Sequence, residues 1–286
     1  LFESDEDILR KKGIIKTLKN PFVIIVSEIF LGDEFLHELN PDGRLELFGQ
    51  EYNEESYAIC GSDMMIKGQS LKNIKFGDSF DKDGFPHSKF GYMLANPPFG
   101  LEWKPEEAFI HKEHEEQGFD GRFGAGLPRI NDGSFLFLQH MISKMKQEGS
   151  RIGIVFNGSP LFTGDAGSGE SNIRKWIIEN DWLEAIVALP DQLFYNTGIF
   201  TYIWIVTNRK APERKGKIQL INAVDFYQKM RRSLGQKRNE ISKQQIYEIT
   251  NIYGEFRESE YLPSLDHDDF GYRNITDNGK INAKYP

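Results

Sequence analysis

The sequence can form neither an internal disulfide bond nor a membrane-spanning helix. Its 286 residues include a single cysteine, Cys60, which therefore has no partner for an internal disulfide. Cys60 lies in an apolar-periodic stretch and is expected to be a buried thiol, which suits the reducing cytoplasm. The longest apolar runs, such as Pro21 to Val26 and Ile199 to Val206, are far shorter than the roughly 20 residues of a spanning helix. We therefore expect a folded cytoplasmic protein.

The usual features of a complete N-terminus are also lacking. The sequence opens on Leu1-Phe2-Glu3-Ser4, without an initiator methionine, a basic segment or a small-residue cleavage site. Such an opening is typical of a fragment, so we expect the natural N-terminus to be missing.

Positive charge is not in excess either, since the formal net charge is -8. A protein that coats nucleic acid through bulk electrostatics needs clustered lysine and arginine, so any DNA binding must use local patches or a partner subunit. One basic cluster lies beyond residue 222, in a polar region that we expect to be helical. It comprises Lys229, Arg231, Arg232, Lys237 and Arg238. This cluster can contact DNA phosphates or a partner, although a solvated helical face is the commoner explanation.

Apolar patterning predicts an α/β domain, because short β-rich runs alternate with helical stretches in the way that favours a mostly parallel sheet. The β-rich runs are Arg44–Phe48, Gly91–Ala95, Arg151–Phe156, Leu183–Ala188, Thr201–Thr207 and Lys217–Asn222. Two predicted helices, Glu54–Lys67 and Ser134–Lys146, each carry an apolar stripe at three- and four-residue spacing. We assign both stripes to core packing.

The residues that point to chemistry follow the run ending at Ala95. Asn96-Pro97-Pro98-Phe99 contains two consecutive prolines, which cannot continue a central strand, so a rigid loop is predicted at the carboxyl end of that strand. Ligands bind at this edge of open α/β sheets. The Asn96 amide oxygen and the Pro97 carbonyl can accept the hydrogens of an aromatic amine, and Phe99 can stack on a flipped base, with no metal ion required. A plain loop after a strand is the alternative.

Further blocks of sequence accompany this tetrapeptide. They are Phe48-Gly49-Gln50-Glu51, Ser56-Tyr57-Ala58, Gly77-Asp78-Ser79, Arg122-Phe123-Gly124 through Pro128, Asp132-Gly133-Ser134, Leu189-Pro190, Tyr195-Asn196-Thr197-Gly198 and Phe270-Gly271-Tyr272-Arg273. Together with the tetrapeptide, they resemble the methylation subunits of type I restriction-modification systems, members of the N6-adenine DNA methylase family. The resemblance spans nearly the whole chain.

The resemblance implies a Rossmann-like S-adenosylmethionine-dependent methyltransferase fold, with a mostly parallel central sheet and a mainly helical C-terminal extension. The catalytic domain is expected at residues 1–222 and the extension at residues 223–286, with the family's N-terminal helical domain absent from this chain. The implied reaction transfers a methyl group from S-adenosylmethionine to N6 of a flipped adenine in double-stranded DNA. The implied partners are a specificity subunit, a restriction subunit and a second methylation subunit.

Roles for two acidic residues are also implied. Glu51, just after a strand, is expected to accept hydrogen bonds from the ribose hydroxyls of the cofactor, and Asp78 to accept from its adenine amino group. Judged from the residues alone, Glu51 can also be a helix-start acid, and Asp78 an Asx-type turn or N-cap.

Aromatic residues around Asn196-Thr197-Gly198 are candidates for the target base, since in similar enzymes an aromatic side chain of this region contacts it. We predict base contacts from Tyr195 and Phe200, with Phe194 as a further candidate and core packing as the alternative. The segment Arg122 to Ile130, rich in glycine, is expected to be a mobile loop near the substrate.

Glycines are missing where the resemblance implies them. The family holds the methionine end of the cofactor in a Gly-rich turn after the first strand, because only glycine lets the backbone approach so closely. Here Thr17 to Leu31 contains no glycine, whereas both flanks, Gly13 to Leu18 and Gly32 to Glu51, keep the resemblance. A double, compensating frameshift would produce this pattern, and we expect the protein as written to bind the cofactor weakly or not at all. Phe22 to Ile25 can still form the first strand.

Two other functions stay open at this point. One is a non-catalytic scaffold that keeps the fold but has lost cofactor binding, which only the missing glycines support. The other is a methyltransferase acting on a protein glutamine or on RNA, because Asn-Pro-Pro-aromatic loops serve amides as well as adenines. The blocks at Gln50-Glu51 and Tyr195 to Gly198 favour DNA.

Overall fold

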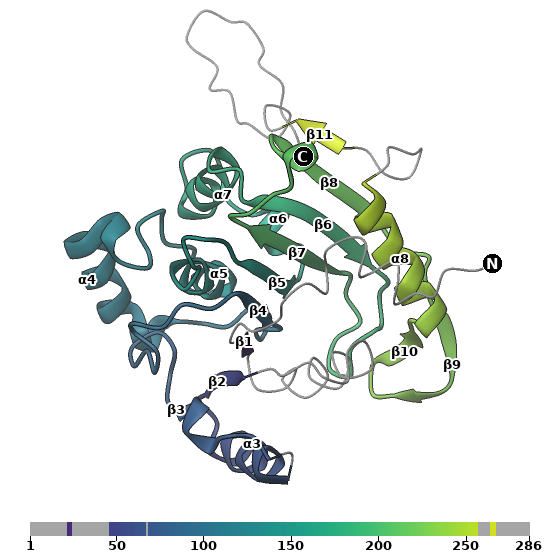
Figure 1. Ribbon diagram of the computed structural model, residues 1–286, viewed down its shortest axis with the longest axis horizontal. Helices are drawn as coiled ribbons and strands as arrows, with labels where there is room; N and C mark the ends of the chain where they lie inside the picture. The colour runs from purple at the N-terminus through teal and green to yellow at the C-terminus, as the bar shows by residue number, and fades with distance from the viewer. Residues whose placement is uncertain (1–21, 25–45, 67, 257–263, 267–286) are drawn as a thin grey trace, which may run out of the picture. The chain divides into compact units, whose positions relative to one another are not determined.

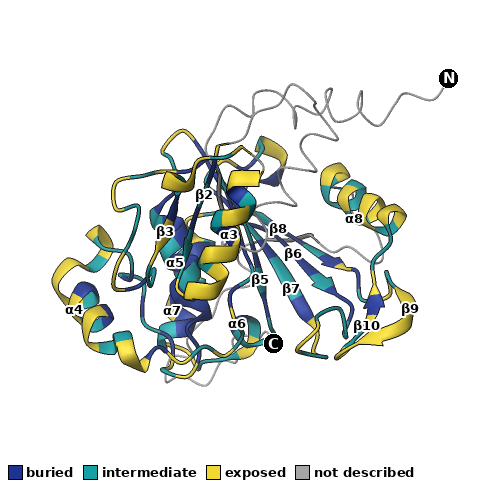
Figure 2. Ribbon diagram, turned by 90° about the horizontal axis from the view of Figure 1, so that it is seen from below, coloured by how far each residue is buried: buried dark blue, intermediate teal, exposed yellow. Residues whose placement is uncertain are grey.

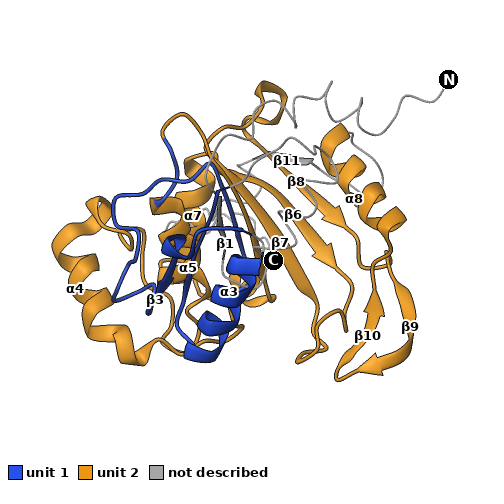
Figure 3. Ribbon diagram, turned by 60° about the horizontal axis from the view of Figure 1, so that its bottom comes forward, with its two compact units in different colours: residues 1–96, 144–146 blue, residues 97–143, 147–286 orange. Residues whose placement is uncertain are grey.

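The computed structural model describes residues 22–24, 46–66, 68–256 and 264–266 (Figure 1). The chain divides into two compact units, the first formed by residues 1–96 and 144–146 and the second by residues 97–143 and 147–286 (Figure 3). No helix in the described ranges is long and apolar enough to cross a membrane. The expected fragment start, most of the glycine-free segment and the block at residues 270–273 lie outside the described residues.

The described residues of unit 1 include four parallel strands in the order β4-β1-β2-β3. They are β1 (Phe22–Ile24), β2 (Leu47–Glu51), β3 (Ile74–Phe76) and β4 (Tyr92–Ala95). The strand expected at Phe22 to Ile25 is confirmed over its first three residues, which pair with both β2 and β4. The helix α3 (Glu54–Ile66) and the short 3-10 helix η1 (Leu71–Asn73) connect β2 to β3. The expected strand Arg44–Phe48 lies about three residues further along the chain, as β2.

Helix α3 shows why the predicted stripe forms. Asn53 precedes it, and the Asn53 side-chain oxygen accepts a hydrogen bond from the Ser56 backbone N–H at 2.9 Å, which caps the helix. Cys60 and Met64, one turn apart, are the buried residues of the helix. Cys60 is 2% exposed, so the prediction of a buried thiol is confirmed, and burial together with the charges of Asp63 and Glu51 raises the pKa of the thiol to about 11.

Among the described residues, unit 2 contributes five strands to the large sheet, in the order β11-β8-β6-β7-β5. They are β5 (Arg151–Phe156), β6 (Leu183–Leu189), β7 (Thr201–Thr207), β8 (Lys217–Asn222) and β11 (Ser264–Asp266). β6 runs parallel to β8 and is buried along almost its whole length (Figure 2), as expected of a central strand. β7 runs antiparallel to β5 and β6, because residues 190–200 join β6 to β7 without a crossover helix.

The helices of unit 2 include one that is almost entirely buried, α5. They are η2 (Lys104–Glu106), α4 (Glu107–Gln117), η3 (Gly118–Asp120), α5 (Ser134–Ser143), α6 (Ser159–Phe162), α7 (Gly169–Glu179), η4 (Pro212–Arg214) and α8 (Lys243–Glu255). Phe135 of α5 packs edge-on against Phe156 and Trp204, with ring centroids 6.0 and 5.9 Å apart. The predicted helix from Ser134 is therefore confirmed, although it ends at Ser143 rather than at Lys146.

The prediction that residues just beyond 222 are helical is wrong. They form a hairpin of β9 (Gln228–Leu234) and β10 (Lys237–Glu240), which pair antiparallel. The turn depends on Gly235, which has a φ of 62°, and a Cβ there would lie 2.5 Å from the Tyr195 carbonyl oxygen. A tertiary contact thus decides the local structure, and periodicity could not reveal it.

Helix α8 follows the hairpin and begins at a capping box formed by Ser242 and Gln245. Its Ile249, Ile252 and Tyr253 pack on a buried cluster from β6 and β8 that includes Val187 and Ile221. The described part of the C-terminal region is therefore partly helical, and its packing belongs to unit 2. The boundary at residues 222 and 223 between two domains stays a prediction.

Candidate active site

Three of the predicted site residues lie at one edge of the unit 1 sheet. Glu51 is the last residue of β2, Asp78 follows β3 by two residues, and Asn96 comes directly after β4. These strands are parallel, so their carboxyl ends share an edge. Along that edge the order is Asn96, the end of β1, Glu51 and Asp78.

The strand order also reverses at this edge. From β1 the chain proceeds outward to β2 and β3 on one side, whereas β4 lies on the other side of β1. In open α/β sheets such a reversal is where ligands bind. The two acids and Asn96 thus flank the carboxyl end of β1, the point from which the glycine-free segment continues outside the described residues.

Glu51 takes part in starting helix α3 and still keeps a free oxygen. Its Oε1 accepts a hydrogen bond from the Asn53 backbone N–H at 2.8 Å, and its backbone carbonyl accepts one from Gly77 at 2.9 Å. Oε2 has no hydrogen bond to another described residue. Glu51 can therefore serve both at the start of the helix and in ligand binding, because a different carboxylate oxygen is used for each.

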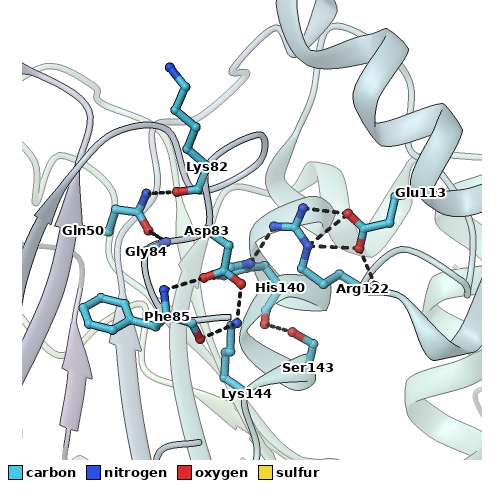
Figure 4. A network of polar contacts seen from close by, with 10 residues as sticks. All are labelled: Gln50, Lys82, Asp83, Gly84, Phe85, Glu113, Arg122, His140, Ser143 and Lys144. Carbon is cyan, nitrogen blue, oxygen red and sulfur yellow. Dashed lines mark hydrogen bonds and ion pairs between the residues drawn. The ribbon is translucent and has the colours of Figure 1, made fainter. Parts of the chain in front are cut away.

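Asp78 likewise uses one carboxylate oxygen for a hydrogen bond within its own loop and leaves the other for a ligand. Its Oδ1 accepts a hydrogen bond from the Phe80 backbone N–H at 2.7 Å, which forms the Asx-type turn considered above. The Gln50 side chain clamps this loop by donating to the carbonyls of Gly77 and Lys82, at 3.1 and 2.7 Å, and by accepting from the Gly84 N–H at 2.9 Å (Figure 4). Every polar atom of the Gln50 amide is thus used to position the loop that carries Asp78.

A buried cation fastens the continuation of the same loop. The Lys144 ammonium forms an ion pair with Asp83 and donates to the Phe85 carbonyl at 2.9 Å (Figure 4). Its side chain is 7% exposed, and that of Asp83 is 15% exposed. Because separating a buried ion pair leaves an uncompensated charge, this contact holds residues 83–85 firmly within unit 1.

The tetrapeptide follows β4 without regular secondary structure and turns at Phe99 and Gly100, where Gly100 has a φ of 67°. Pro97 is buried, Pro98 is exposed, and Asn96 is half-buried. The Asn96 side-chain amide makes no hydrogen bond to another residue that the structure describes. The predicted loop at the carboxyl end of the strand is confirmed, and it presents an amide whose hydrogen-bonding capacity is available to a ligand.

The aromatic candidates for base contact all lie in unit 2. Phe99 meets Phe194 edge-on, with ring centroids 6.2 Å apart and an interplanar angle of 83°. Phe194 is half-buried, whereas Tyr195 and Phe200 are 62% and 51% exposed. The ring that the structure brings to Phe99 is therefore Phe194, while the exposure of Tyr195 and Phe200 rules out core packing for both.

The loop beyond Phe99 is anchored by Trp103, which is 1% exposed. The Trp103 backbone N–H donates to the Ile130 carbonyl at 3.0 Å, and its indole N–H donates to the Arg129 carbonyl at 2.9 Å. A further bond runs from the Gly133 N–H to the Leu101 carbonyl at 2.8 Å. Residues 129–133 thus form the support of the loop that begins with the tetrapeptide.

A buried carboxylate, Asp132, organises this support. Its Oδ1 accepts from the Ser134 hydroxyl at 2.6 Å, and its Oδ2 accepts from the Ser159 hydroxyl at 2.5 Å and from Arg129 at 3.4 Å. Burial alone would raise the pKa of Asp132, but the hydrogen bonds from Ser134 and Ser159 and the charge of Arg129 outweigh it, so this pKa lies below its usual value. The group is therefore ionised at neutral pH.

The segment from Arg122 to Ile130, which its glycines predict to be a mobile loop, makes close contacts with neighbouring elements. Arg122 forms an ion pair with Glu113 at 2.7 Å (Figure 4), and both side chains are nearly buried. Gly126 has a φ of 148°, and a Cβ there would lie 2.9 Å from the Gly169 carbonyl oxygen. Glycine serves here for close packing, which cannot be told from a flexible loop by composition.

Sequence reasoning assigned no role to Gln50, Trp103 or Asp132. A signal existed for Asp132, since aspartate and serine just before an apolar helical run form a capping pattern. Nothing in the sequence indicates the contacts of Gln50 and Trp103, which join segments 26 to 34 residues apart.

Comparison with known proteins adds a family match. The model of the N-6 DNA methylase family matches residues 26–278. The type I restriction enzyme MjaIX methylase subunit of Methanocaldococcus jannaschii is 29% identical over 217 residues, which cover 76% of this chain and 37% of that protein. The HindI methylase subunit of Haemophilus influenzae is 33% identical over 181 residues, which cover 63% of this chain and 38% of that protein. The chain thus spans less than two fifths of the length of these relatives.

A solved structure confirms the predicted fold. The type I restriction-modification system methyltransferase subunit from Streptococcus thermophilus superimposes with a TM-score of 0.72 at 21% identity, over 94% of this chain and 56% of that chain. The mixed sheet with flanking helices described above is therefore an α/β methyltransferase fold.

Proposed function

The chain belongs to the N-6 DNA methylase family, and from that premise we propose that it is the catalytic portion of a site-specific DNA adenine-N6 methyltransferase subunit. The observation that carries the proposal is the place of Asn96-Pro97-Pro98-Phe99 directly after β4, beside the strand at which the sheet order reverses. A loop at this point meets ligands in open α/β sheets.

The side chains of the loop fit an exocyclic aromatic amine. The amine's lone pair is delocalised into the ring, so it becomes nucleophilic only when its hydrogens are held and its geometry is biased. We assign the Asn96 amide oxygen and the Pro97 carbonyl as the two acceptors. The two prolines fix the loop before the substrate arrives, so little ordering entropy is lost on binding.

A flipped adenine would also need an apolar face on which to stack. Phe99 and Phe194 already meet edge-on, and Tyr195 and Phe200 lie exposed in the same connection between β6 and β7. We propose that the base stacks on Phe99 or Phe194, and that Tyr195 and Phe200 contact it from the exposed side.

The described residues fit the adenosine half of S-adenosylmethionine. Glu51 and Asp78 each keep one carboxylate oxygen clear of the other described residues, and they end adjacent strands. In the proposal Glu51 accepts from the ribose hydroxyls and Asp78 from the adenine amino group. The cofactor supplies an electrophilic methyl group. Because Thr17 to Leu31 lacks glycine, we expect binding of the methionine half to be weak.

We further propose that the chain works within a type I restriction-modification assembly in the cytoplasm. The relatives that it matches are methylase subunits of type I restriction enzymes. The net charge of -8 favours dependence on other subunits for recognition of duplex DNA. The proposed partners are a specificity subunit, a restriction subunit and a second methylation subunit.

Two measurements test the proposal. Calorimetric titration with S-adenosylmethionine is expected to give a dissociation constant weaker than micromolar, and micromolar affinity would overturn the effect assigned to the missing glycines. Incubation with millimolar labelled cofactor, duplex DNA and the specificity subunit is expected to place label on adenine N6. A matched duplex whose adenines already carry N6-methyl groups serves as the control.

The competing functions give different results. Label on protein or RNA, with none on DNA, would sink the DNA assignment. Label on no substrate, despite cofactor binding, would contradict methyl transfer. Absence of both label and cofactor binding would favour the scaffold, which the missing glycines of Thr17 to Leu31 support.

A further inference from the structure

We infer that the β9–β10 hairpin binds the phosphate backbone of duplex DNA beside the flipped base. The inference rests on the proposed function, because it takes duplex DNA as the substrate. It concerns a surface that lies outside the tetrapeptide and the two acids.

Charge distinguishes the hairpin from the rest of the chain. Residues 228–240 carry five basic side chains and one acidic side chain, a net charge of +4, within a protein whose net charge is -8. Lys229, Arg231, Arg232 and Arg238 are exposed, as Figure 2 shows for β9 as a whole. None of the four forms an ion pair with another described residue. A local excess of unpaired cations on an acidic protein is what an anionic polymer such as DNA requires.

The hairpin is held without using those charges. A two-stranded ribbon is marginally stable by itself, so its neighbours must fix it. Gln236 donates its N–H to the Tyr195 carbonyl at 2.9 Å, and the N–H groups of Arg238 and Asn239 donate to the Gln192 carbonyl at 2.9 and 3.1 Å. The Asn239 side chain, 3% exposed, donates to the Asp191 carbonyl at 3.0 Å. The hairpin is thus attached through backbone groups and one buried amide. Its basic side chains stay available for contacts with phosphates.

The attachment point is the loop of the predicted base contacts. Tyr195 accepts the Gln236 bond through its carbonyl, and its ring lies under the Lys237 ammonium, 5.1 Å from the centroid. The adjacent Phe194 meets Phe99. The cations are therefore fixed to the segment that would contact the flipped base, which is where phosphates flanking that nucleotide must pass.

The shape of the surface also suits phosphates. A hollow of about 620 Å³ lies against the hairpin and is lined by Gln192, Lys229, Met230, Ser233, Arg238 and Asn239. Lysine, arginine, serine and amide side chains are the usual donors to phosphate oxygens. The seven residues of β9 span about 20 Å, the length of about six base pairs, so several phosphates can be contacted at once.

Salt dependence of DNA binding tests the inference directly. Anisotropy of a labelled duplex is measured with the full chain in the presence of the specificity subunit over a range of sodium chloride concentrations, and the slope of log K against log salt is compared among variants of the chain. Lys229→Gln, Arg231→Gln and Arg232→Gln combined are expected to reduce the magnitude of the slope by about 2 to 3, since each phosphate contact contributes about 0.9. Affinity at 0.1 M salt should fall by about two orders of magnitude.

A matched control removes the same charge elsewhere. Lys104→Gln, Lys112→Gln and Lys175→Gln combined act on exposed residues of η2, α4 and α7, and α4 and α7 lie on the far side of unit 2 from the hairpin (Figure 1). This variant is expected to change the slope by less than about 1. Circular dichroism of both triple variants should match that of the unaltered chain, because only exposed side chains change.

The outcomes separate the inference from the proposed function. Binding by the unaltered chain with an unchanged slope in the hairpin variant overturns the inference alone, and leaves an acidic protein partner as the occupant of the hairpin. An equal loss of DNA affinity in both triple variants also overturns the inference, because total charge, and not the position of the hairpin, would then explain DNA binding. A chain that does not bind the duplex at 50 mM salt, and does not methylate it, overturns both.

Discussion

Two loops of unit 2 that would face the target base are held in opposite ways. Residues 97–103 end in the buried Trp103 and are tied to residues 129–133 by three hydrogen bonds, two from Trp103 and one from the Gly133 N–H to the Leu101 carbonyl. Residues 190–200 expose Tyr195 and Phe200, and their contacts beyond the strand ends are mainly with the hairpin. The loop assigned to hold the amine is thus anchored through a buried side chain, whereas the loop assigned to the base's face is anchored to the hairpin mainly through its backbone and leaves two rings exposed.

This division has a physical reason. Acceptors that favour a developing geometry act only if they are already in place, because their reorganisation would cost the energy that they supply. Stacking tolerates small displacements, since dispersion and burial depend weakly on orientation. Substitutions in the first loop should therefore affect chemistry, and substitutions in the second should affect binding.

The largest effect is expected from Asn96→Ala. Removing the amide oxygen deletes an acceptor for the adenine amine, and such losses cost about 10²- to 10³-fold in kcat. Methyl transfer to DNA, measured at saturating cofactor, should fall by that factor with an unchanged Tm. Asn172→Ala, an exposed asparagine on α7, serves as the control and should leave kcat unchanged. Retained activity in the Asn96 variant would show that this loop does not supply the acceptor for the adenine amine.

Phe194→Ala should reduce kcat/KM by about 10- to 100-fold, because stacking on an aromatic ring contributes about 1–3 kcal/mol per base. We expect the loss to appear mainly in KM. Tyr195→Ala and Phe200→Ala are expected to have smaller effects, since neither ring packs on Phe99. Steady-state kinetics on the three variants would show which ring serves the base, and a larger loss for Phe200→Ala would contradict the assignment of Phe194.

Asp132→Asn tests the support of the first loop. The substitution leaves buried hydroxyls and Arg129 without their charged acceptor, which should lower the free energy of unfolding by about 2 kcal/mol. The folded-state pKa of Asp132 lies below the usual 3.8, so its stabilisation is present above that pH and is lost as pH falls through the folded value. Urea titrations of both proteins should therefore differ at pH 7 and converge as the pH falls below 3.8. A constant difference would show that the charge is not responsible.

The smallest effect is expected from Asn239→Ala, which weakens the hairpin's attachment while keeping all five of its basic residues. Loss of the bonds to Asp191 should cost about 1 kcal/mol of stability and weaken DNA binding by a few fold, with nearly the same salt slope. Asn251→Ala, on α8, is the matched control. DNA affinity unchanged in the Asn239 variant would show that position of the hairpin is irrelevant.

Local patterns predicted much of the fold because strands and helices with strong periodicity form where their apolar residues require. Thr201–Thr207, rich in β-branched and aromatic residues, was predicted with both ends correct. The hairpin was missed because its turn depends on the approach of Gly235 to Tyr195, a contact between distant residues. The close packing of the segment after Arg122 does not follow from its sequence for the same reason, since Gly126 meets the backbone of Gly169.

In the candidate site, too, some features follow from the sequence and others depend on the tertiary fold. The place of Glu51, Asp78 and Asn96 at strand ends follows from the sequence, because a strand's carboxyl end is visible in the pattern of residues. The groups that hold them in place do not follow, since Gln50 and Asp132 act through loops that only the tertiary fold brings to them. Sequence thus indicates the reacting groups better than their supports.

The most direct test of the proposed function is mass spectrometry of nucleosides from duplex DNA incubated with the chain, the specificity subunit and millimolar S-adenosylmethionine. The account predicts N6-methyldeoxyadenosine as the product, and its loss in the Asn96→Ala variant. A chain that binds the cofactor yet forms no N6-methyldeoxyadenosine, or forms a methylated cytosine instead, would contradict it.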